Sequence, residues 1–420
     1  MRTTSDFYFR RFGFCERQIA EPPHPGLGII VVVPCMNEPD LINSLESLLA
    51  CEPSNCKAEV IVVINSPAGC SEEIRAQNLK TWEEASRWSK EHSNSSLIFH
   101  ILHFPNLPPK QAGVGLARKI GMDEAVRRFD DIGRPAGIVV CYDADCRCER
   151  NYLRSIERHF ERNPRTPGCS IYFEHPLDGP LEAKVYEAIA AYELHLRYYV
   201  QGLRFAGFPH AHHTVGSCMA VRADVYRKQG GMNKRNAGED FYFLQKIFPL
   251  GAFTELTDTT VNPSPRGSDR VPFGTGKAVR DFSTGIKTGT YPLEAFLDLK
   301  MLFERLPATH HHEPSLRSDL CDGLPESLRT FLRAQKFTEA LTEIRNNTST
   351  TAAFRARFFR WFNGFRAMKF IHHARDDYYG EPAIEAEAER LLQLLSGSVG
   401  GQAAGSTREL LLAYRRLERA

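Results

Sequence analysis

Residues 137–146 read Gly-Ile-Val-Val-Cys-Tyr-Asp-Ala-Asp-Cys, an apolar run that stops at two carboxylates. The β-branched residues predict a buried strand, so Asp143 and Asp145 follow directly where that strand ends. Open α/β folds bind ligands at the carboxyl ends of their parallel strands. Hard divalent ions prefer carboxylate oxygens and keep waters and substrate phosphates as their other ligands. The pair therefore predicts a divalent-ion site, with two solvated loop acids as the alternative.

On both sides of this strand, short apolar runs alternate with helical patterns. The other expected strands lie at 28–33, 58–64, 97–104 and 169–173, and the expected helices at 41–49, 71–90, 114–129, 150–162 and 181–201. This alternation indicates βαβ units in an α/β fold, with a Rossmann-like, mostly parallel sheet flanked by helices. Residues 262–292 are rich in Gly, Ser, Thr and Pro and predict an extended loop. Because strand patterns stop there, we expect an α/β domain over 1–292 and a helical C-terminal extension over 293–420.

Composition narrows the class of protein. The 420 residues carry 53 Lys and Arg against 51 Asp and Glu, a net charge of +2, which argues against a nucleic-acid partner. The 11 cysteines are too sparse for a disulfide framework and include no paired Cys-x-x-Cys, so a zinc site is not expected. The N-terminus lacks the apolar segment of a signal peptide, and no apolar run approaches the ~20 residues of a membrane span. We therefore expect a cytoplasmic protein.

Three further motifs place polar residues around the acidic strand. The strand at 28–33 runs into Pro34-Cys-Met-Asn-Glu38, and Ala117-Arg-Lys-Ile-Gly121 lies on the helix that precedes the acidic strand. Gly216-Ser-Cys-Met-Ala-Val-Arg222 is followed by Gly238-Glu-Asp-Phe241, where two acids open a helix with apolar periodicity. For these two acids, N-terminal helix capping is the alternative interpretation.

In this order and spacing, the motifs resemble those of the family 2 glycosyltransferases of the GT-A fold, over about Gly28–Ile247. VVVPCMNE is similar to the strand and turn that border the donor nucleotide. GVGLARKIG and VVCYDADC resemble the helix and the Asp-x-Asp strand of the family. GSCMAVRADVYRKQGGM looks like the segment before the acceptor site, and GEDFYFL is similar to the Glu-Asp motif that supplies the catalytic base.

The resemblance implies roles for the matching residues. Asp240 would deprotonate the acceptor hydroxyl, with Glu239 beside it to orient the acceptor or the base. Asp145 would coordinate Mg²⁺ or Mn²⁺ on the sugar diphosphate, and Asp143 would contact the nucleotide and the same metal. Arg118 would approach the nucleotide or its phosphates. A carboxylate base and a metal are the groups that a hydroxyl nucleophile and a diphosphate leaving group require.

The nucleoside pocket would be lined by Pro34, Asn37 and Glu38. Many family members carry an acidic contact to the base after the second strand, where this chain has Asn65. That contact is therefore missing or replaced by Asn65. The resemblance implies a UDP- or GDP-sugar as donor. We expect a basic residue after the Glu-Asp motif, Arg266, Arg270 or Lys277, to close on the diphosphate, since Arg pairs bidentately with phosphate. A polar surface loop is the alternative.

Residues 354–370 predict a basic amphipathic helix whose apolar face carries Phe354, Phe358, Trp361, Phe365 and Met368. Packing on the catalytic domain or on a second subunit is the favoured interpretation. The alternative is peripheral contact with the inner face of the membrane, which a lipid-linked acceptor would require.

The resemblance implies a metal-dependent, inverting transfer of a hexosyl or related group to a hydroxyl of a carbohydrate or lipid-linked acceptor. The chain lacks the Gln-x-x-Arg-Trp motif of processive polymerases, which favours single transfer. A sugar-nucleotide nucleotidyltransferase is an alternative, but it would need a basic Gly-rich loop after the first strand. A non-catalytic sugar-nucleotide-binding protein is another, although it would more readily have lost one of Asp143, Asp145 or Asp240.

Overall fold

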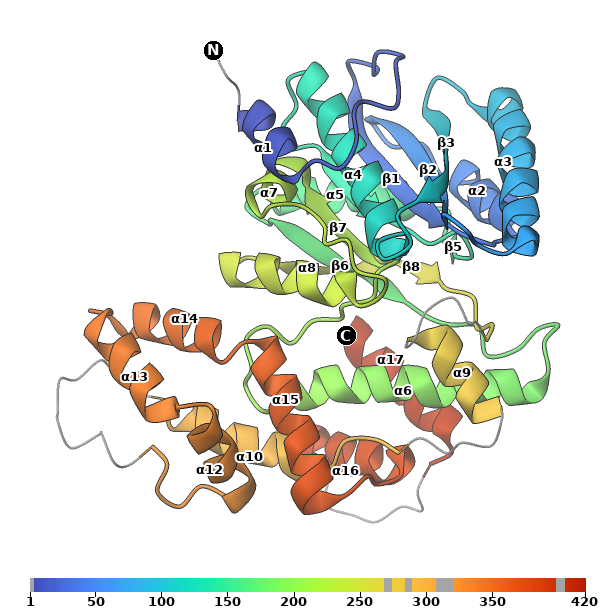
Figure 1. Ribbon diagram of the computed structural model, residues 1–420. Helices are drawn as coiled ribbons and strands as arrows, with labels where there is room; N and C mark the ends of the chain where they lie inside the picture. Colours follow the sequence, from blue (N-terminus) through green and yellow to red (C-terminus); the bar gives the residue numbers. More distant parts are fainter. Residues whose placement is uncertain (1–3, 268–273, 284–288, 307–319, 398–404) are drawn as a thin grey trace. The chain divides into compact units, whose positions relative to one another are not determined.

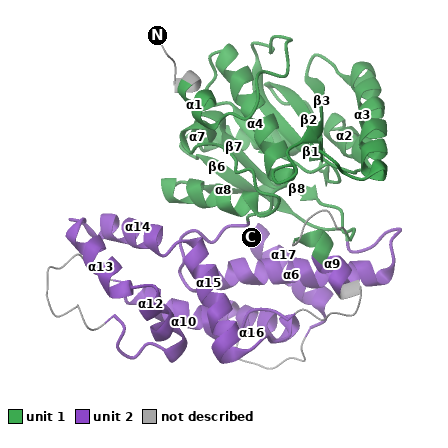
Figure 2. Cartoon of the chain, in the orientation of Figure 1, with its two compact units in different colours: residues 1–176, 214–277 green, residues 177–213, 278–420 purple. Residues whose placement is uncertain are grey.

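Strand β1 (Leu27–Cys35) lies inside an eight-stranded sheet and is apolar over nearly its whole length. The computed structural model describes residues 4–267, 274–283, 289–306, 320–397 and 405–420. The chain forms two compact units, and Figure 2 shows unit 1 as residues 1–176 and 214–277 and unit 2 as residues 177–213 and 278–420. The boundary expected at residue 292 differs from this division, because residues 177–213 belong with the C-terminal helices.

The sheet of unit 1 has the strand order β3-β2-β1-β4-β7-β6-β8-β5. Its other strands are β2 (Lys57–Pro67), β3 (Leu97–Leu107), β4 (Ile138–Cys141), β5 (Arg147–Cys148), β6 (Gly168–Phe173), β7 (Met219–Arg222) and β8 (Thr254–Asn262). Strands β3, β2, β1 and β4 are parallel, β8 is parallel to β6, and β7 and β5 run antiparallel to their neighbours. The mostly parallel α/β sheet that the sequence predicts is confirmed.

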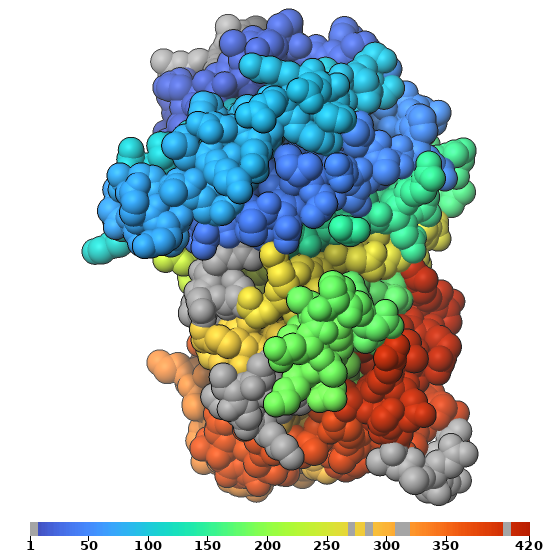
Figure 3. All heavy atoms as spheres, turned by 90° about the vertical axis from the view of Figure 1, so that its right-hand side faces the viewer, coloured from blue at the N-terminus to red at the C-terminus, as the bar shows by residue number. Residues whose placement is uncertain are grey.

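Helices cover both faces of this sheet (Figure 1). They are α1 (Thr4–Phe12), α2 (Leu41–Leu49), α3 (Glu72–His92), α4 (Val114–Asp131), α5 (Tyr152–Arg162), α7 (Ala223–Lys228), α8 (Glu239–Ile247) and the 3₁₀ turn η1 (Phe248–Leu250). Ile30 and Val32 pack in the same core as Leu116 of α4, whereas their neighbours in β1 point to the opposite face. A β-carbon at Gly121 would lie 2.5 Å from Val32 Cγ1, so glycine allows α4 to lie close against β1. Helix α3, light blue in Figure 3, lies at the surface of unit 1.

Unit 2 is helical in its described parts. It contains α6 (Ala183–Phe205), α10 (Leu293–Glu304), α12 (Glu326–Ala334), α13 (Phe337–Asn346), α14 (Thr351–Trp361), α15 (Gly364–Ala374), the π turn η2 (Arg375–Tyr379), α16 (Ile384–Ser396) and α17 (Thr407–Arg419). Helix α6 contacts α10, α16 and α17 around one apolar core. Within the described ranges, none of the helices combines the length and the apolar character needed to cross a membrane.

The single helix expected over 354–370 is wrong, because the structure divides it into α14 and α15. Helix α14 ends at Trp361, and Asn363 caps α15, its side chain accepting hydrogen bonds from the N–H groups of Phe365 and Arg366 at 3.1 and 3.2 Å. Phe354 and Phe358 are 2% and 0% exposed and pack in the core of unit 2. A membrane contact would need these rings at the surface, so their burial favours the packing interpretation.

Candidate functional site

The polar turns after β1 and β4 lie side by side at one edge of the sheet. Val32 of β1 pairs with Cys141 of β4, and the N–H of Tyr142 donates to the carbonyl oxygen of Val32 at 3.0 Å. The two strands are parallel, so the chain leaves both at the same edge. The turn 36–38 therefore adjoins the turn 142–145, as the sequence predicts.

Arg118, on α4, joins the two acidic motifs. Its Nη2 donates to Asp143 Oδ1 and its Nη1 donates to Glu239 Oε1. Arg118 and Glu239 are 3% and 2% exposed, whereas Asp143 is 37% exposed. A planar guanidinium carries five N–H donors and can hold two carboxylates at once. Arg118 thus fixes the turn after β4 against the first turn of α8, which lies about a hundred residues further along the chain.

Gly216 provides the space that Arg118 occupies. A β-carbon at this position would lie 2.5 Å from Arg118 Nη1 and 2.8 Å from Cζ, closer than a side chain can approach. Glycine is therefore required here for the guanidinium to reach both carboxylates. This gives the glycine of the Gly216–Arg222 motif a structural role beside the acids.

The two acids in the first turn of α8, Glu239 and Asp240, have raised pKa values. The surface of Asp240 is partly exposed, yet the protein packed around it disfavours the ionised form; this desolvation, with repulsion from Glu239, raises the pKa of Asp240 to about 7. Burial also raises the pKa of Glu239, with Arg118 opposing the shift. Burial disfavours the charge of Arg118, but Asp143 and Glu239 outweigh it and raise the arginine's pKa. Asp240 can therefore take up and release a proton near neutral pH.

Arg266 holds a second group of acids at the same edge. Its Nη2 donates to Glu38 Oε2 at 2.6 Å and its Nη1 donates to Asp40 Oδ2 at 3.0 Å. The same Nη2 lies 3.6 Å from Asp145 Oδ2. Glu38 is fully buried, whereas Arg266 is 29% exposed. A cation thus lies beside the carboxylate predicted to bind the metal.

The residues predicted to line the nucleoside pocket differ in exposure. Pro34 is buried inside β1, and Asn65 is 2% exposed with its Nδ2 donating to Ala112 O at 3.0 Å. Asn37 is exposed, with a left-handed φ of 50°, and its N–H donates to Asn78 Oδ1 at 2.7 Å. Of this set, Asn37 is the one whose side chain is open to a ligand.

Two other basic residues, Arg270 and Lys277, are predicted together with Arg266 as candidates to bind the diphosphate. Arg270 falls outside the described residues. Lys277 lies in the first turn of α9 (Thr275–Ser283) and is half-buried. The extended loop expected over 262–292 is wrong at this point, because its sequence forms a helix there.

A comparison with known protein families matches the part of the chain that carries most of these motifs. Residues 30–230 match the family described as glycosyl transferase family 2. Residues 30–230 form a family 2 glycosyltransferase domain. The fold is GT-A, as the resemblance implies. The match ends before Glu239 and Asp240; Glu239 contacts the matched residues through its bond to Arg118, and Asp240 is the next residue.

Among solved structures, TarS 1–349 from S. aureus in complex with UDP-GlcNAc is similar at 13% identity, with a TM-score of 0.40; the similarity covers 80% of this chain and 90% of that one. The same protein in complex with UDP is similar at 11% identity with a TM-score of 0.38, covering 90% of this chain and 95% of that one. No curated protein matches the sequence.

The glycosyltransferase domain offers two carboxylates to a metal. Asp143 and Asp145 are 37% and 24% exposed, and their oxygens are ligands that Mg²⁺ and Mn²⁺ prefer. In the ranges that the structure describes, no three His, Cys, Asp or Glu side chains gather to hold a metal ion. The pair therefore fits a hard ion that takes its other ligands from water and from the donor's phosphates, and it does not fit a metal held by protein alone.

Sequence reasoning missed two residues that shape this site. Asp40 could have been found, because it is an acid two residues after Glu38 in a polar turn. Asn78 gives no such signal, since one more polar residue in the polar helix α3 looks solvated. It is nevertheless 1% exposed and its amide bonds to Asn37 N and to Asn65 O, at 2.7 and 3.0 Å.

Proposed function

We propose that the glycosyltransferase domain moves one sugar per event from a UDP- or GDP-sugar to a hydroxyl of a carbohydrate or lipid-linked acceptor, with inversion and with Mg²⁺ or Mn²⁺. The observation that carries this proposal is the position of Arg118. Its guanidinium bonds to Asp143 in the Asp-x-Asp turn and to Glu239 in the Glu-Asp motif. The acids for the donor and for the acceptor are thereby held in one site.

Asp240 is the general base of this proposal. A base works best when its pKa lies near the working pH, and the pKa of Asp240 is about 7. It takes the proton from the acceptor hydroxyl as the oxygen attacks the sugar. Glu239 is a positioning residue. Its buried carboxylate bonds to Arg118, and this bond holds the first turn of α8, which also carries Asp240.

The donor side consists of Asp143, Asp145 and Arg266. Asp143 and Asp145 would hold the divalent ion, which supplies Lewis-acid neutralisation of the diphosphate leaving group. Arg266 lies beside Asp145 and can pair with phosphate oxygens when the donor enters. Asn37 is exposed at the same edge and can contact the nucleoside.

Inversion follows if base and leaving group lie on opposite faces of the sugar. Asp240 lies in the first turn of α8, whereas Asp145 follows β4, so the base and the metal ligand come from separate segments. A single displacement by the acceptor oxygen breaks the bond between the anomeric carbon and the diphosphate. The hydroxyl proton goes to Asp240, and the nucleoside diphosphate leaves with the bonding electrons.

A thermal-unfolding screen with nucleoside diphosphates, each with and without Mn²⁺, tests the donor side. One nucleotide is expected to raise the unfolding temperature in the presence of Mn²⁺, since a ligand at 100 times its Kd adds about 2.7 kcal/mol of stability. Asp145→Asn should remove this Mn²⁺-dependent shift. The control is Asp258→Asn, which changes an acid of β8 that is 71% exposed and should leave the shift intact. A nucleotide shift that needs no Mn²⁺ and survives Asp145→Asn would refute the metal role.

A further inference from the structure

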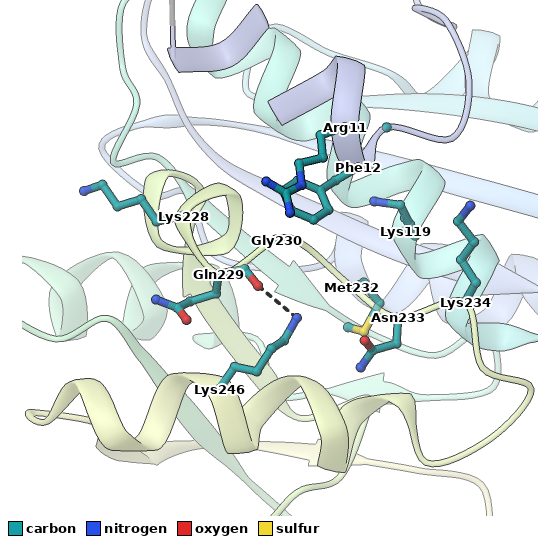
Figure 4. Close-up of a pocket in the computed structure, with 11 residues that line it drawn as sticks. Arg11, Phe12, Lys119, Lys228, Gln229, Gly230, Met232, Asn233, Lys234 and Lys246 are labelled. Carbon is teal, nitrogen blue, oxygen red and sulfur yellow. Dashed lines mark hydrogen bonds between the residues drawn. The ribbon is translucent and has the colours of Figure 1, made fainter. Parts of the chain in front are cut away.

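A basic cavity lies in unit 1, lined by α1, α4, α7, α8 and the segment after α7. Its volume is about 560 Å³. Its 11 lining residues include five cations and no carboxylate (Figure 4). The cations are Arg11, Lys119, Lys228, Lys234 and Lys246. None of these residues has a role in the proposed transfer reaction.

The cavity lies against a different face of the two helices that carry the catalytic motifs. Arg118 and Lys119 are neighbours on α4, and successive side chains on a helix point about 100° apart. Arg118 reaches Asp143 and Glu239, whereas Lys119 reaches Asp123. On α8, Lys246 lies about 9 Å along the helix axis from Asp240, at ~1.5 Å per residue. A ligand in the cavity would therefore touch both helices without occupying the acidic site.

Two of the five cations are neutralised by acids. Lys119 Nζ lies 3.1 Å from Asp123 Oδ2, and Lys228 Nζ donates to Asp224 Oδ2 at 2.7 Å. Both acids lie outside the lining of the cavity.

The other three cations have no carboxylate partner within the described residues. Lys246 Nζ donates to the carbonyl oxygens of Gln229 and Gly231 at 3.0 and 2.6 Å. Arg11 and Lys234 lie over the rings of Phe12 and Phe14, at 5.2 and 5.1 Å from the ring centroids. These cations thus bring three uncompensated positive charges to one concave surface.

The pKa values of the two buried lysines, Lys119 and Lys246, are lowered, as expected where burial is combined with positive charges that lie close together. Burial, together with the smaller effect of the charge of Lys119, lowers the pKa of Lys246 to about 8. Burial likewise lowers the pKa of Lys119; Asp123 opposes the shift, and Lys234 adds to it. Each of these lysines therefore carries a repulsion that a bound anion would relieve.

We propose that this cavity binds a small phosphorylated organic molecule. Phosphate oxygens accept hydrogen bonds from Lys and Arg, and Gln229 and Asn233 add amide groups to the lining. The volume lies in the range of ligand sites, roughly 300–1,000 Å³, which leaves room for an organic group beside the phosphate. Phe12 and Met232 offer that group an apolar wall.

Titration calorimetry at low ionic strength tests the proposal, with inorganic pyrophosphate and glucose 6-phosphate as probes. The double variant Arg11→Gln/Lys234→Gln removes two exposed cations of the cavity. We expect the Kd of each probe to rise about tenfold or more, since a hydrogen bond to a charged group contributes about 1.5–3 kcal/mol. The matched control is Arg87→Gln/Lys90→Gln, which removes two exposed cations from α3 and the same net charge. Its Kd should stay within about twofold of wild type, because exposed charges at a distance are screened.

Three outcomes overturn the proposal. One is the absence of saturable binding of either probe to the wild-type chain. Another is an equal loss of affinity in both double variants, which would show a general charge effect. The third is binding that Arg266→Gln removes and Arg11→Gln/Lys234→Gln leaves intact, because the probe would then occupy the donor site. Lys234→Gln alone repeats the test if the double variant does not fold.

Discussion

Each unit of the chain buries an arginine between carboxylates, but the balance of charge around the two arginines differs. In unit 1, Arg118 bonds to Asp143 and Glu239, and Asp240 adds a third carboxylate. Three carboxylates therefore surround one arginine, so the negative charge of this cluster is not fully compensated. The pKa of Asp240 is accordingly raised to about 7, with desolvation as its largest cause and Glu239 next.

In unit 2 the cations match the acids. Arg197 bonds to Glu193 of its own helix α6 and to Glu418 of α17. Arg415 donates to Glu193 at 2.8 Å, and His213 Nε2 lies 3.0 Å from Glu418 Oε1. Burial alone would raise the pKa of Glu418, but His213 and Arg197 outweigh it and lower the pKa to about 2.

The difference separates a site for chemistry from an ionic cluster that stabilises the fold. An acid with a raised pKa costs folding free energy at neutral pH, and such groups are concentrated at active sites. An acid with a lowered pKa stabilises the folded state instead. We therefore expect variants of the two clusters to fail in opposite ways: the cluster in unit 1 in turnover, and the cluster in unit 2 in stability.

The largest effect is expected for Asp240→Asn. Turnover should fall about 10²–10⁴-fold, because general-base catalysis contributes this much. The unfolding temperature at pH 8 should not fall, since the variant removes a carboxylate that Glu239 repels. The measurements are the release of nucleoside diphosphate from the donor that the screen identifies, and thermal unfolding. Weaker donor binding with turnover retained would contradict the base assignment, as would a lower unfolding temperature.

Arg197→Met should reverse this pattern. Removing one partner of a buried ion pair costs about 3–5 kcal/mol, because the remaining carboxylates stay buried. The matched control is Arg408→Met, whose pair with Asp178 in the same unit is 56% and 86% exposed. It should cost at most about 1 kcal/mol. Equal losses for both variants in urea-induced unfolding would show that the buried cluster does not stabilise unit 2.

In unit 1, the sequence predicts the features that depend on local patterns and misses those that depend on contacts between distant residues. Strands β1 and β4 and the acids that follow them were predictable, since apolar runs and the polar residues at their ends are local patterns. The meeting of these turns at one edge follows from the geometry of a parallel sheet. The bond from Arg118 to Glu239 joins residues 121 positions apart, and nothing local announces it. The need for glycine at position 216 arises from that same contact.

Unit 2 could be predicted less well. Its helices follow from periodicity, but the placement of α6 with α16 and α17 depends on contacts between distant segments. The aromatic positions of 354–370 fit one continuous helix, and the break came from Asn363, whose capping side chain competes with helix continuation. Glu193 and Arg197 of α6 look like an ordinary surface pair at helical spacing, yet both are fully buried.

An intermediate effect is expected for Glu418→Gln, and it should depend on pH. The pKa of Glu418 is about 2 in the folded chain, below the usual 4.5, so the ionised acid stabilises the fold above pH 4.5. This stabilisation, on the order of 3 kcal/mol, is lost as the pH falls from 4.5 toward 2. Urea unfolding at a series of pH values should show the full gap between wild type and variant near pH 5, and a narrowing gap below pH 4.5. A gap that does not change with pH would mean that the charge of Glu418 contributes nothing.

The smallest effect is a tenfold change of rate per pH unit, in the pH profile of turnover. Asp240 acts as a base only when it is ionised, and its pKa is about 7, so the logarithm of turnover should rise with unit slope below pH 7 and level off above it. Besides desolvation, the groups that set this pKa are Glu239, Arg118, the backbone N–H of Phe241 and Asp143. Glu239→Gln removes the largest repulsion and releases Arg118 from its partner, and both changes favour the ionised form of Asp240. Its profile should therefore shift to lower pH, even where its turnover is reduced. A profile in the same place for wild type and variant would assign the titration to another group, and the raised pKa would then no longer separate the cluster in unit 1 from the cluster in unit 2.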